Sequence, residues 1–327
     1  MNPKVSVCIP TYNTARYLAE AIDSVLAQEF TDFELVICDN ASTDDTPEVC
    51  RRYTDPRIRY VRFSELTNQA GNFNRCLDEA KGEFITLLHA DDYFLPGFLA
   101  DRVSRLDDQP DVGFVFGAVQ VVDSEGEAIS LKSQWKEDRF FPLGELFKLL
   151  LSSCLICPPS LMVRRSCTLK TAPFRVDLTW GHDWEWTLRL AENSAACYVA
   201  RPLAAYREHD ASGTAAILNA ATNGRQERLI LRETMARSSI NNDSIGGLRR
   251  SAFHSLSRRH MYFADQALLA GRRSITLKNL WYAALADPFM LTRPTFWALL
   301  VGSTGSTKLY GRYRSLRKAA GLPGANS

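Results

Sequence analysis

Residues 83–96 read EFITLLHADDYFLP. The apolar run that follows Gly82 is typical of a strand buried on both faces of a sheet. The run stops at His89, Asp91 and Asp92, so one imidazole and two adjacent carboxylates stand where the strand ends. In open parallel α/β sheets, ligands bind just beyond the carboxyl ends of the strands, and these side chains suit a divalent cation. The same two aspartates would also serve as caps for a following helix.

Three strand–helix units precede this stretch. Apolar runs predict strands over residues 5–9 and 33–38, and alternating apolar residues predict an edge strand over 57–63. A segment with helical periodicity follows each of them. Alternation of this kind predicts an α/β fold, with a mostly parallel sheet flanked by helices on right-handed crossovers. The first turn, residues 10–13, has no G-x-G-x-x-G sequence, which argues against a dinucleotide-binding domain.

Polar side chains follow the predicted strands at the same end. Thr11 and Asn13 come after the first strand, Asp39 comes after the second, and Asp91 and Asp92 come after the fourth. The carboxyl ends of parallel strands meet at one edge of a sheet. We therefore expect these groups, which are far apart in the chain, to converge on one cleft.

The character of the chain changes near residue 214. Before it, long apolar runs predict single strands over residues 112–122 and 198–206. After it, helical patterns dominate to the end of the chain. We therefore expect an α/β domain over residues 1–214 and a helical C-terminal region over residues 215–327.

The composition excludes several classes of protein. The 327 residues carry a formal net charge of +2, which argues against a nucleic-acid partner. No run approaches the ~18–20 apolar residues of a membrane span. The first residues do not resemble a secretion signal, and the eight cysteines are scattered, as in reduced cytosolic proteins. We therefore expect a cytoplasmic protein.

Five short motifs occur in order along residues 3–213. They are VSVCIPTYN at 5–13, DNASTDDT at 39–46, HADD at 89–92, GHD at 181–183 and YREH at 206–209. Taken together, they resemble the motifs of the family 2 glycosyltransferases, which have the GT-A fold. The resemblance implies transfer of a sugar from a nucleoside diphosphate donor, with inversion and with Mn²⁺ or Mg²⁺ as the cofactor.

The resemblance also implies roles for individual residues. Asp183 would be the catalytic base, and Asp39 would hydrogen-bond a uracil or thymine base. The nucleotide sugar would be bound by Pro10, Thr11, Asn13, Asp39, Asn72, Asp91 and Arg207. The cation would be held by Asp91, Asp92 and His209, and the acceptor would contact Trp180 and His182.

Two positions depart from the family pattern. His89 stands in place of the first aspartate of the D-x-D motif, and His182 stands in place of the acidic residue before the base. Four of the implied roles also have structural alternatives. These are Asp183 as a helix N-cap, Asp39 as a turn former, His209 as a surface histidine and Arg207 as the partner of a carboxylate.

These features predict a metal-dependent inverting glycosyltransferase. The resemblance further implies a UDP- or dTDP-sugar as donor, a hydroxyl of a glycan or lipid-linked acceptor, and a place in bacterial cell-surface polysaccharide synthesis. A sugar nucleotidyltransferase is one alternative, but it would need a glycine-rich basic loop after the first strand, and residues 10–16 do not supply one. A nucleotide-sugar-binding module without turnover is the other, although intact Asp91, Asp92 and Asp183 argue against it.

The C-terminal end combines an apolar segment with positive charge. Residues 289–301 are apolar, and five basic side chains follow: Lys308, Arg312, Arg314, Arg317 and Lys318. Such an end can lie on an anionic membrane surface. It can also pack on the catalytic domain as a helix with a solvated basic face. The first alternative predicts peripheral contact with the inner face of the cell membrane through residues 289–318.

Overall fold

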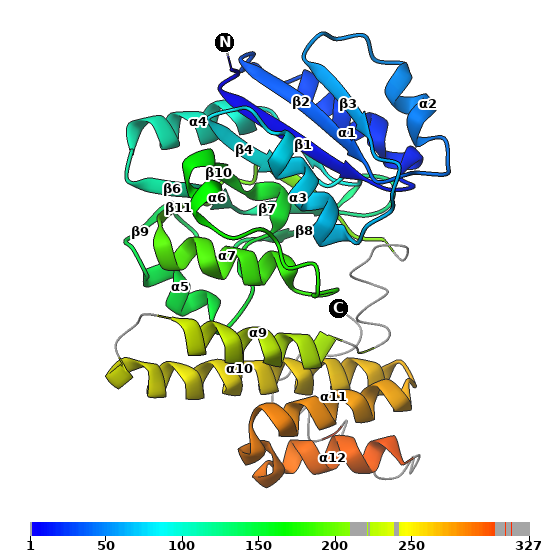
Figure 1. Ribbon diagram of the computed structural model, residues 1–327. Helices are drawn as coiled ribbons and strands as arrows, with labels where there is room; N and C mark the ends of the chain where they lie inside the picture. Colours follow the sequence, from blue (N-terminus) through cyan, green and yellow to red (C-terminus); the bar gives the residue numbers. More distant parts are fainter. Residues whose placement is uncertain are drawn as a thin grey trace. The chain divides into compact units, whose positions relative to one another are not determined.

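The computed structural model describes residues 2–209, 221, 223–238, 242–304, 311 and 315 (Figure 1). The chain divides into two compact units. One comprises residues 1–150 and 154–209, and the other comprises residues 151–153 and 210–327. The boundary that we predict at residue 214 lies outside the described residues.

The first unit alternates strands and helices. Its elements are β1 (Val5–Thr11), α1 (Ala15–Leu26), β2 (Phe33–Asp39), α2 (Thr46–Arg51), β3 (Ile58–Arg62), α3 (Gln69–Glu79), β4 (Phe84–Leu87), β5 (Tyr93–Phe94), α4 (Phe98–Asp108), β6 (Val112–Gly117), β7 (Val119–Val122), β8 (Ala128–Lys132), β9 (Arg139–Phe141), α5 (Glu145–Leu150), η1 (Pro158–Ser160), β10 (Met162–Arg164), α6 (Arg165–Lys170), α7 (His182–Asn193), β11 (Ala195–Val199) and β12 (Ala204–Arg207).

The large sheet has the strand order β3-β2-β1-β4-β10-β6-β11-β9. Strands β3, β2, β1 and β4 are parallel to one another, and β6 is parallel to β11. Strand β10 runs antiparallel between β4 and β6, and β9 runs antiparallel along the edge. The mostly parallel sheet flanked by helices is therefore confirmed. Thr11 pairs with Asp39 at the ends of β1 and β2, so the predicted convergence of strand ends begins there.

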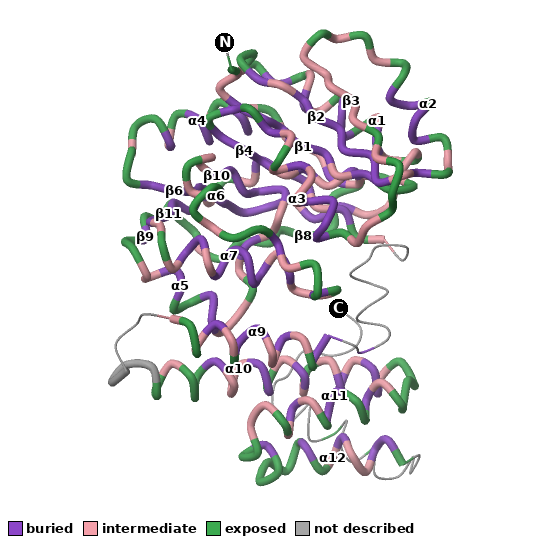
Figure 2. The backbone as a smooth tube through the Cα atoms, viewed as in Figure 1, coloured by how far each residue is buried: buried purple, intermediate pink, exposed green. Residues whose placement is uncertain are grey.

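Apolar residues of β1 alternate between two cores. Val7 and Ile9 pack with Ile22 of α1 on one face of the sheet, and Cys8 packs with Cys76 of α3 on the other. Figure 2 shows this part of the sheet largely in the colour of buried residues. Each such side chain contributes ~1.5–3 kcal/mol on burial. Helices on both faces leave only the strand ends of this sheet open to ligands.

Two segments that we predict as single strands are each divided between the large sheet and a second, smaller sheet. It has four strands in the order β5-β12-β7-β8. The run over residues 112–122 breaks at Ala118 into β6 of the large sheet and β7 of the small one. The run over residues 198–206 breaks in the same way into β11 and β12. The single-strand prediction is wrong at both places, because apolar periodicity continues across a point where the chain changes sheets.

The second unit is helical where it is described. Its elements are α9 (Asn223–Arg237), α10 (Asn242–Leu269), α11 (Arg273–Ala286), η2 (Pro288–Thr292) and α12 (Pro294–Ser303). Gly271, at φ +72°, turns the chain between α10 and α11. Leu268, Leu280 and Phe296 belong to the buried core that these helices share. Of the described helices, none combines the length and the hydropathy needed to cross a membrane.

Candidate active site

Pairing of β5 with β12 brings two distant motifs together. The chain leaves β4, passes through residues 89–92 and enters β5, where Tyr93 pairs with Ala205. The Arg207 backbone N–H donates to Asp92 Oδ1 at 2.8 Å. His209 Nε2 lies 3.1 Å from Asp91 Oδ2. The predicted proximity of His209 to the acidic pair is therefore present, across more than a hundred residues of chain.

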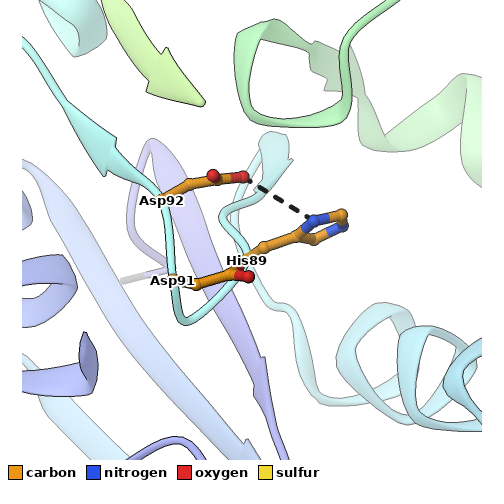
Figure 3. A group of neighbouring side chains, drawn as sticks. All are labelled: His89, Asp91 and Asp92. Carbon is orange, nitrogen blue, oxygen red and sulfur yellow. Dashed lines mark ion pairs between the residues drawn. The ribbon is translucent and has the colours of Figure 1, made fainter. Parts of the chain in front are cut away.

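His89, Asp91 and Asp92 form one cluster of potential metal ligands. One ligand atom of each lies within 4.8 Å of the others. Figure 3 shows the three side chains on one loop, with His89 Nδ1 and Asp92 Oδ2 facing each other at 3.7 Å. Asp92 Oδ2 is buried without a hydrogen-bond partner among the described residues. A nitrogen and several carboxylate oxygens at this spacing fit Mn²⁺ or Mg²⁺.

The electrostatics of the cluster favour the entry of a cation. Burial, together with the Asp91 carboxylate, raises the pKa of Asp92 well above its ordinary value. Burial lowers the pKa of His89, so its imidazole is the neutral form that binds metals. A divalent cation would offset the desolvation of the Asp92 carboxylate. The Asp91 side chain is 26% exposed and so is the member of the cluster that a ligand reaches most easily.

Arg207 fixes this arrangement through contacts with the protein itself. Its Nε donates to the Asp91 carbonyl at 2.8 Å, and its Nη1 donates to the carbonyls of Asp123 and Ser124 at 3.1 Å. Its Nη2 pairs with Glu20. The side chain is 1% exposed, so the guanidinium is a positioning group. Of the two alternatives for Arg207, the structure has the carboxylate partner; the phosphate contact stays a prediction.

Asp39 ends β2 with its carboxylate fully buried. Oδ1 accepts from the Ser42 N–H at 2.8 Å, and Oδ2 accepts from the Tyr60 hydroxyl at 2.5 Å. Arg62 Nε lies 3.6 Å from Oδ2. Asp39 therefore does form its own turn, as the structural alternative has it. Tyr60 and Arg62, which the sequence analysis did not single out, complete a polar group at the base-binding position that we predict.

Thr11 and Asn13 brace the two loops that flank this edge. Asn13, at φ +54°, accepts from the Thr43 N–H at 2.8 Å, and its own N–H donates to Ser42 Oγ at 3.0 Å. Thr11 Oγ1 lies 2.5 Å from Thr14 Oγ1. These contacts hold the turn after β1 against the turn after β2. A nucleotide at this edge would meet a preorganised backbone.

Pro10 and Asn72 lie beside the same edge. Pro10 is half-buried in β1. Asn72 is buried in the first turn of α3, where its Nδ2 donates to the Cys38 carbonyl at 3.1 Å. Asn72 Oδ1 has no partner among the described residues. Contact of either residue with the nucleotide stays a prediction.

Asp183 lies in the first turn of α7, but it does not cap the helix. The N-cap is Gly181, whose φ of +70° suits glycine, and Asp183 is the second helical residue. Asp183 Oδ1 accepts from the Trp184 N–H at 2.8 Å. The side chain lines a narrow, largely apolar cavity of about 30 Å³ together with His89, Phe73 and Trp186. The N-cap alternative is wrong, and Asp183 lines the same cavity as His89 of the metal-ligand cluster.

The other proton acceptors near Asp183 are engaged or buried. Glu185 is 1% exposed and forms a bidentate pair with Arg189, at 3.0 Å and 2.8 Å to Oε2. His182 is 6% exposed and packs edge-on against Phe73, with ring centroids 5.3 Å apart. Burial lowers the pKa of His182. His182 therefore lies in the core of the site, and its contact with an acceptor stays a prediction, as does that of the half-buried Trp180.

A clamp of asparagines, missed in the sequence analysis, holds the loop before α7. Asn74 Nδ2 donates to the Phe174 carbonyl at 2.9 Å, and the Phe174 N–H donates back to Asn74 Oδ1 at 2.7 Å. Asn68 donates to the Val176 carbonyl at 2.5 Å. Phe174 stacks on Trp186 at 4.4 Å. Asn74 lies inside α3, where helix propensity disfavours asparagine, and is the signal that could have indicated this role.

Comparisons with known proteins agree with this geometry. The family model described as glycosyl transferase family 2 matches residues 6–168. The chain belongs to glycosyl transferase family 2. It is a glycosyltransferase with the GT-A fold, so the family match decides against the sugar nucleotidyltransferase alternative.

One relative and two solved structures similar to this chain have informative names. The GalNAc(5)-diNAcBac-PP-undecaprenol beta-1,3-glucosyltransferase of Campylobacter jejuni is 36% identical over 127 residues, 38% of this chain and 40% of that protein. S. aureus TarS 1–349 in complex with UDP-GlcNAc has a TM-score of 0.56 at 18% identity, over 89% of this chain and 92% of that one. The mannosyltransferase PcManGT of Pyrobaculum calidifontis, with GDP-Man and Mn²⁺, has a TM-score of 0.55 at 20% identity, over 93% and 86%.

Proposed function

We propose that this glycosyltransferase moves a sugar, with inversion, from a UDP- or dTDP-sugar to a hydroxyl of a glycan or lipid-linked acceptor. One observation carries the proposal. His89 belongs to the metal-ligand cluster and also lines the cavity that Asp183 lines. The leaving diphosphate and the attacking hydroxyl must meet at one anomeric carbon. A side chain shared by the cation cluster and the cavity of a candidate base brings the two halves of such a reaction close together.

Asp183 would act on the acceptor side. The acceptor hydroxyl oxygen attacks the anomeric carbon from the face opposite the diphosphate, and the bond to the diphosphate oxygen breaks. Asp183 takes the hydroxyl proton as the new glycosidic bond forms. Glu185 is taken by Arg189 and the His182 ring is buried, which supports Asp183 as the base in this segment.

The leaving group would lie on the other side of His89. Asp91, Asp92, His89 and His209 are the side chains that would hold Mn²⁺ or Mg²⁺. A divalent cation there would neutralise the charge that develops on the diphosphate as the bond breaks. Arg207 keeps the acidic pair in place by binding the Asp91 carbonyl and the Asp92 carboxylate from behind.

The names of the relatives and solved neighbours support the proposed donor, cation and acceptor. A solved neighbour carries UDP-GlcNAc, which agrees with a uridine donor, and another carries Mn²⁺. The Campylobacter relative is named for an undecaprenol-linked acceptor, which agrees with a lipid-linked acceptor in bacterial cell-surface polysaccharide synthesis.

Calorimetric titration with a panel of nucleotide sugars, with and without Mn²⁺, tests the proposal beside an assay of donor turnover. We expect tight binding of a uridine or thymidine donor only with the cation, together with transfer or slow hydrolysis. Metal-dependent binding without any turnover, with every acceptor class tried, would support a binding module in place of an enzyme.

Asp39 should contribute to donor binding. We expect Asp39→Ala to weaken UDP binding by ~1.5–3 kcal/mol, the range for a hydrogen bond to a charged group. Because the substitution also leaves the Ser42 N–H and the Tyr60 hydroxyl unpaired, the fold itself should lose some stability. Tyr60→Phe removes a bond to the same carboxylate and serves as the control. UDP affinity is measured by calorimetry on folded protein. If Asp39→Ala binds UDP as tightly as Tyr60→Phe and the wild type do, Asp39 is only a turn former.

A further inference from the structure

The helical unit contains a groove lined by arginines. The groove measures about 680 Å³ and lies among α9, α10 and α11. Its lining consists of Arg228, Arg232, Gly246, Arg249, Arg250, Phe253, Leu285, Ala286 and Asp287. It lies wholly within the second unit, and none of the residues assigned to glycosyl transfer belongs to it.

The positive charge of the groove is not neutralised by the part of the chain that the structure describes. No hydrogen bond or ion pair within that part involves the guanidinium of Arg228, Arg232, Arg249 or Arg250. Among the described residues of the lining, Asp287 is the one acidic side chain. Its Oδ2 pairs with His254 Nδ1 at 2.7 Å, and its Oδ1 accepts from the Phe289 N–H at 3.0 Å.

Such a cluster is unfavourable without an anion. Arg228 and Arg232 are four residues apart on α9, a spacing at which like charges destabilise a helix. Arg249 and Arg250 add two more charges from α10. Arg228 Nε is buried and has no partner among the described residues. Guanidinium groups bind phosphate oxygens in bidentate geometry, so a phosphate is the anion that this groove fits best.

An exposed apolar stripe borders the groove. Leu277, Trp281 and Leu285 lie four residues apart along α11 and are 45%, 63% and 37% exposed. Leu285 also lines the groove, so the stripe and the arginines share an edge. Just beyond, Phe289 is 77% exposed. Tryptophan and leucine side chains beside basic groups are typical of a surface that enters the headgroup region of a bilayer.

We infer that the groove binds the phosphate headgroups of an anionic membrane, with the α11 stripe inserted beside them. The apolar stripe favours a lipid over a soluble phosphate compound, because it would otherwise stay in water. The membrane contact then centres on α9–α11. It does not rest on the predicted segment 289–318, whose five basic residues lie outside the described residues. The contact is independent of the transfer chemistry, so it can be tested by binding alone.

Co-sedimentation of the full chain with vesicles tests the inference. Phosphatidylcholine vesicles with and without phosphatidylglycerol are compared at low and high salt. The groove variant is Arg228→Gln with Arg232→Gln, Arg249→Gln and Arg250→Gln. The control variant removes four exposed charges from the first unit: Arg52→Gln, Lys81→Gln, Lys148→Gln and Lys170→Gln.

We expect the wild type to bind anionic vesicles and to dissociate as salt rises. The groove variant should bind at least ~10-fold more weakly, and the control variant should stay within about threefold of the wild type. Trp281→Ala, which keeps every charge, should also weaken binding. Equal loss in the groove and control variants would overturn the inference. So would binding of inorganic phosphate in the groove with no binding to anionic vesicles.

Discussion

Replacement of Asp183 by asparagine should lower kcat at least ~10²-fold, the lower end for loss of a general base. Asparagine has the same size and can still accept from the Trp184 N–H, but it cannot take a proton from the acceptor hydroxyl at neutral pH. Donor affinity and thermal stability should stay close to those of the wild type. The measurement is turnover with the true acceptor at saturating donor.

Asp177→Asn is the matched control for this result. Asp177 lies in the same segment, is 60% exposed and pairs only with Arg175 among the described residues, so its loss should change neither rate nor stability appreciably. Wild-type kcat in Asp183→Asn would remove Asp183 from the mechanism. Because Glu185 is held by Arg189, His182 would then be the side chain to test next.

Replacement of Asp91 by asparagine should abolish most metal-dependent turnover. A cation that stabilises the leaving diphosphate contributes several kcal/mol, and each 1.36 kcal/mol is tenfold in rate, so a loss of roughly 10²–10³-fold is expected. The fold should survive, because Arg207 Nε binds the backbone carbonyl of Asp91, which the substitution keeps. Turnover is measured across a range of Mn²⁺ concentrations, and metal binding is measured separately by calorimetry.

Glu125→Gln is a suitable control for the loss of one carboxylate. Glu125 is 71% exposed, pairs with Arg16 of α1 and is not a member of the cluster. Chelation of the wild type with EDTA should reproduce the rate of Asp91→Asn, and added Mn²⁺ should restore the wild type only. Full activity after exhaustive chelation would exclude a metal-dependent mechanism.

The parallel part of the sheet could be predicted from the sequence because its signals are local. Buried runs such as 5–9 and 33–38 are long enough to show strand character, and polar residues mark where they stop. That pattern alone predicts which polar side chains lie at the carboxyl ends of the parallel strands. His209 was placed near Asp91 only through the resemblance to a family, and the structure brings the two side chains together.

The small sheet could not be predicted in this way. Strand β5 has two residues, too few to show any periodicity, and yet its pairing with β12 brings Arg207 and His209 to Asp92 and Asp91. Arg207 could have met a phosphate or a carboxylate, and only tertiary contacts decide between them. The engagement of Glu185 by Arg189, which supports the proposal of Asp183 as the base, depends equally on which face of α7 is buried.

The pairing of β5 with β12 also affects the order in which parts of the first unit fold. Asp92 and Arg207 are 115 residues apart, so closing this contact costs more chain entropy than forming the local β1–α1–β2 unit. During synthesis the β1–α1–β2 unit can fold before residue 207 has left the ribosome, whereas Arg207 and His209 can join Asp92 and Asp91 only afterwards. We expect pulsed hydrogen exchange during refolding to protect the amides of β1 before that of Arg207. A protein that folds in this order completes its candidate active site last, after the strands β1 and β2 have formed.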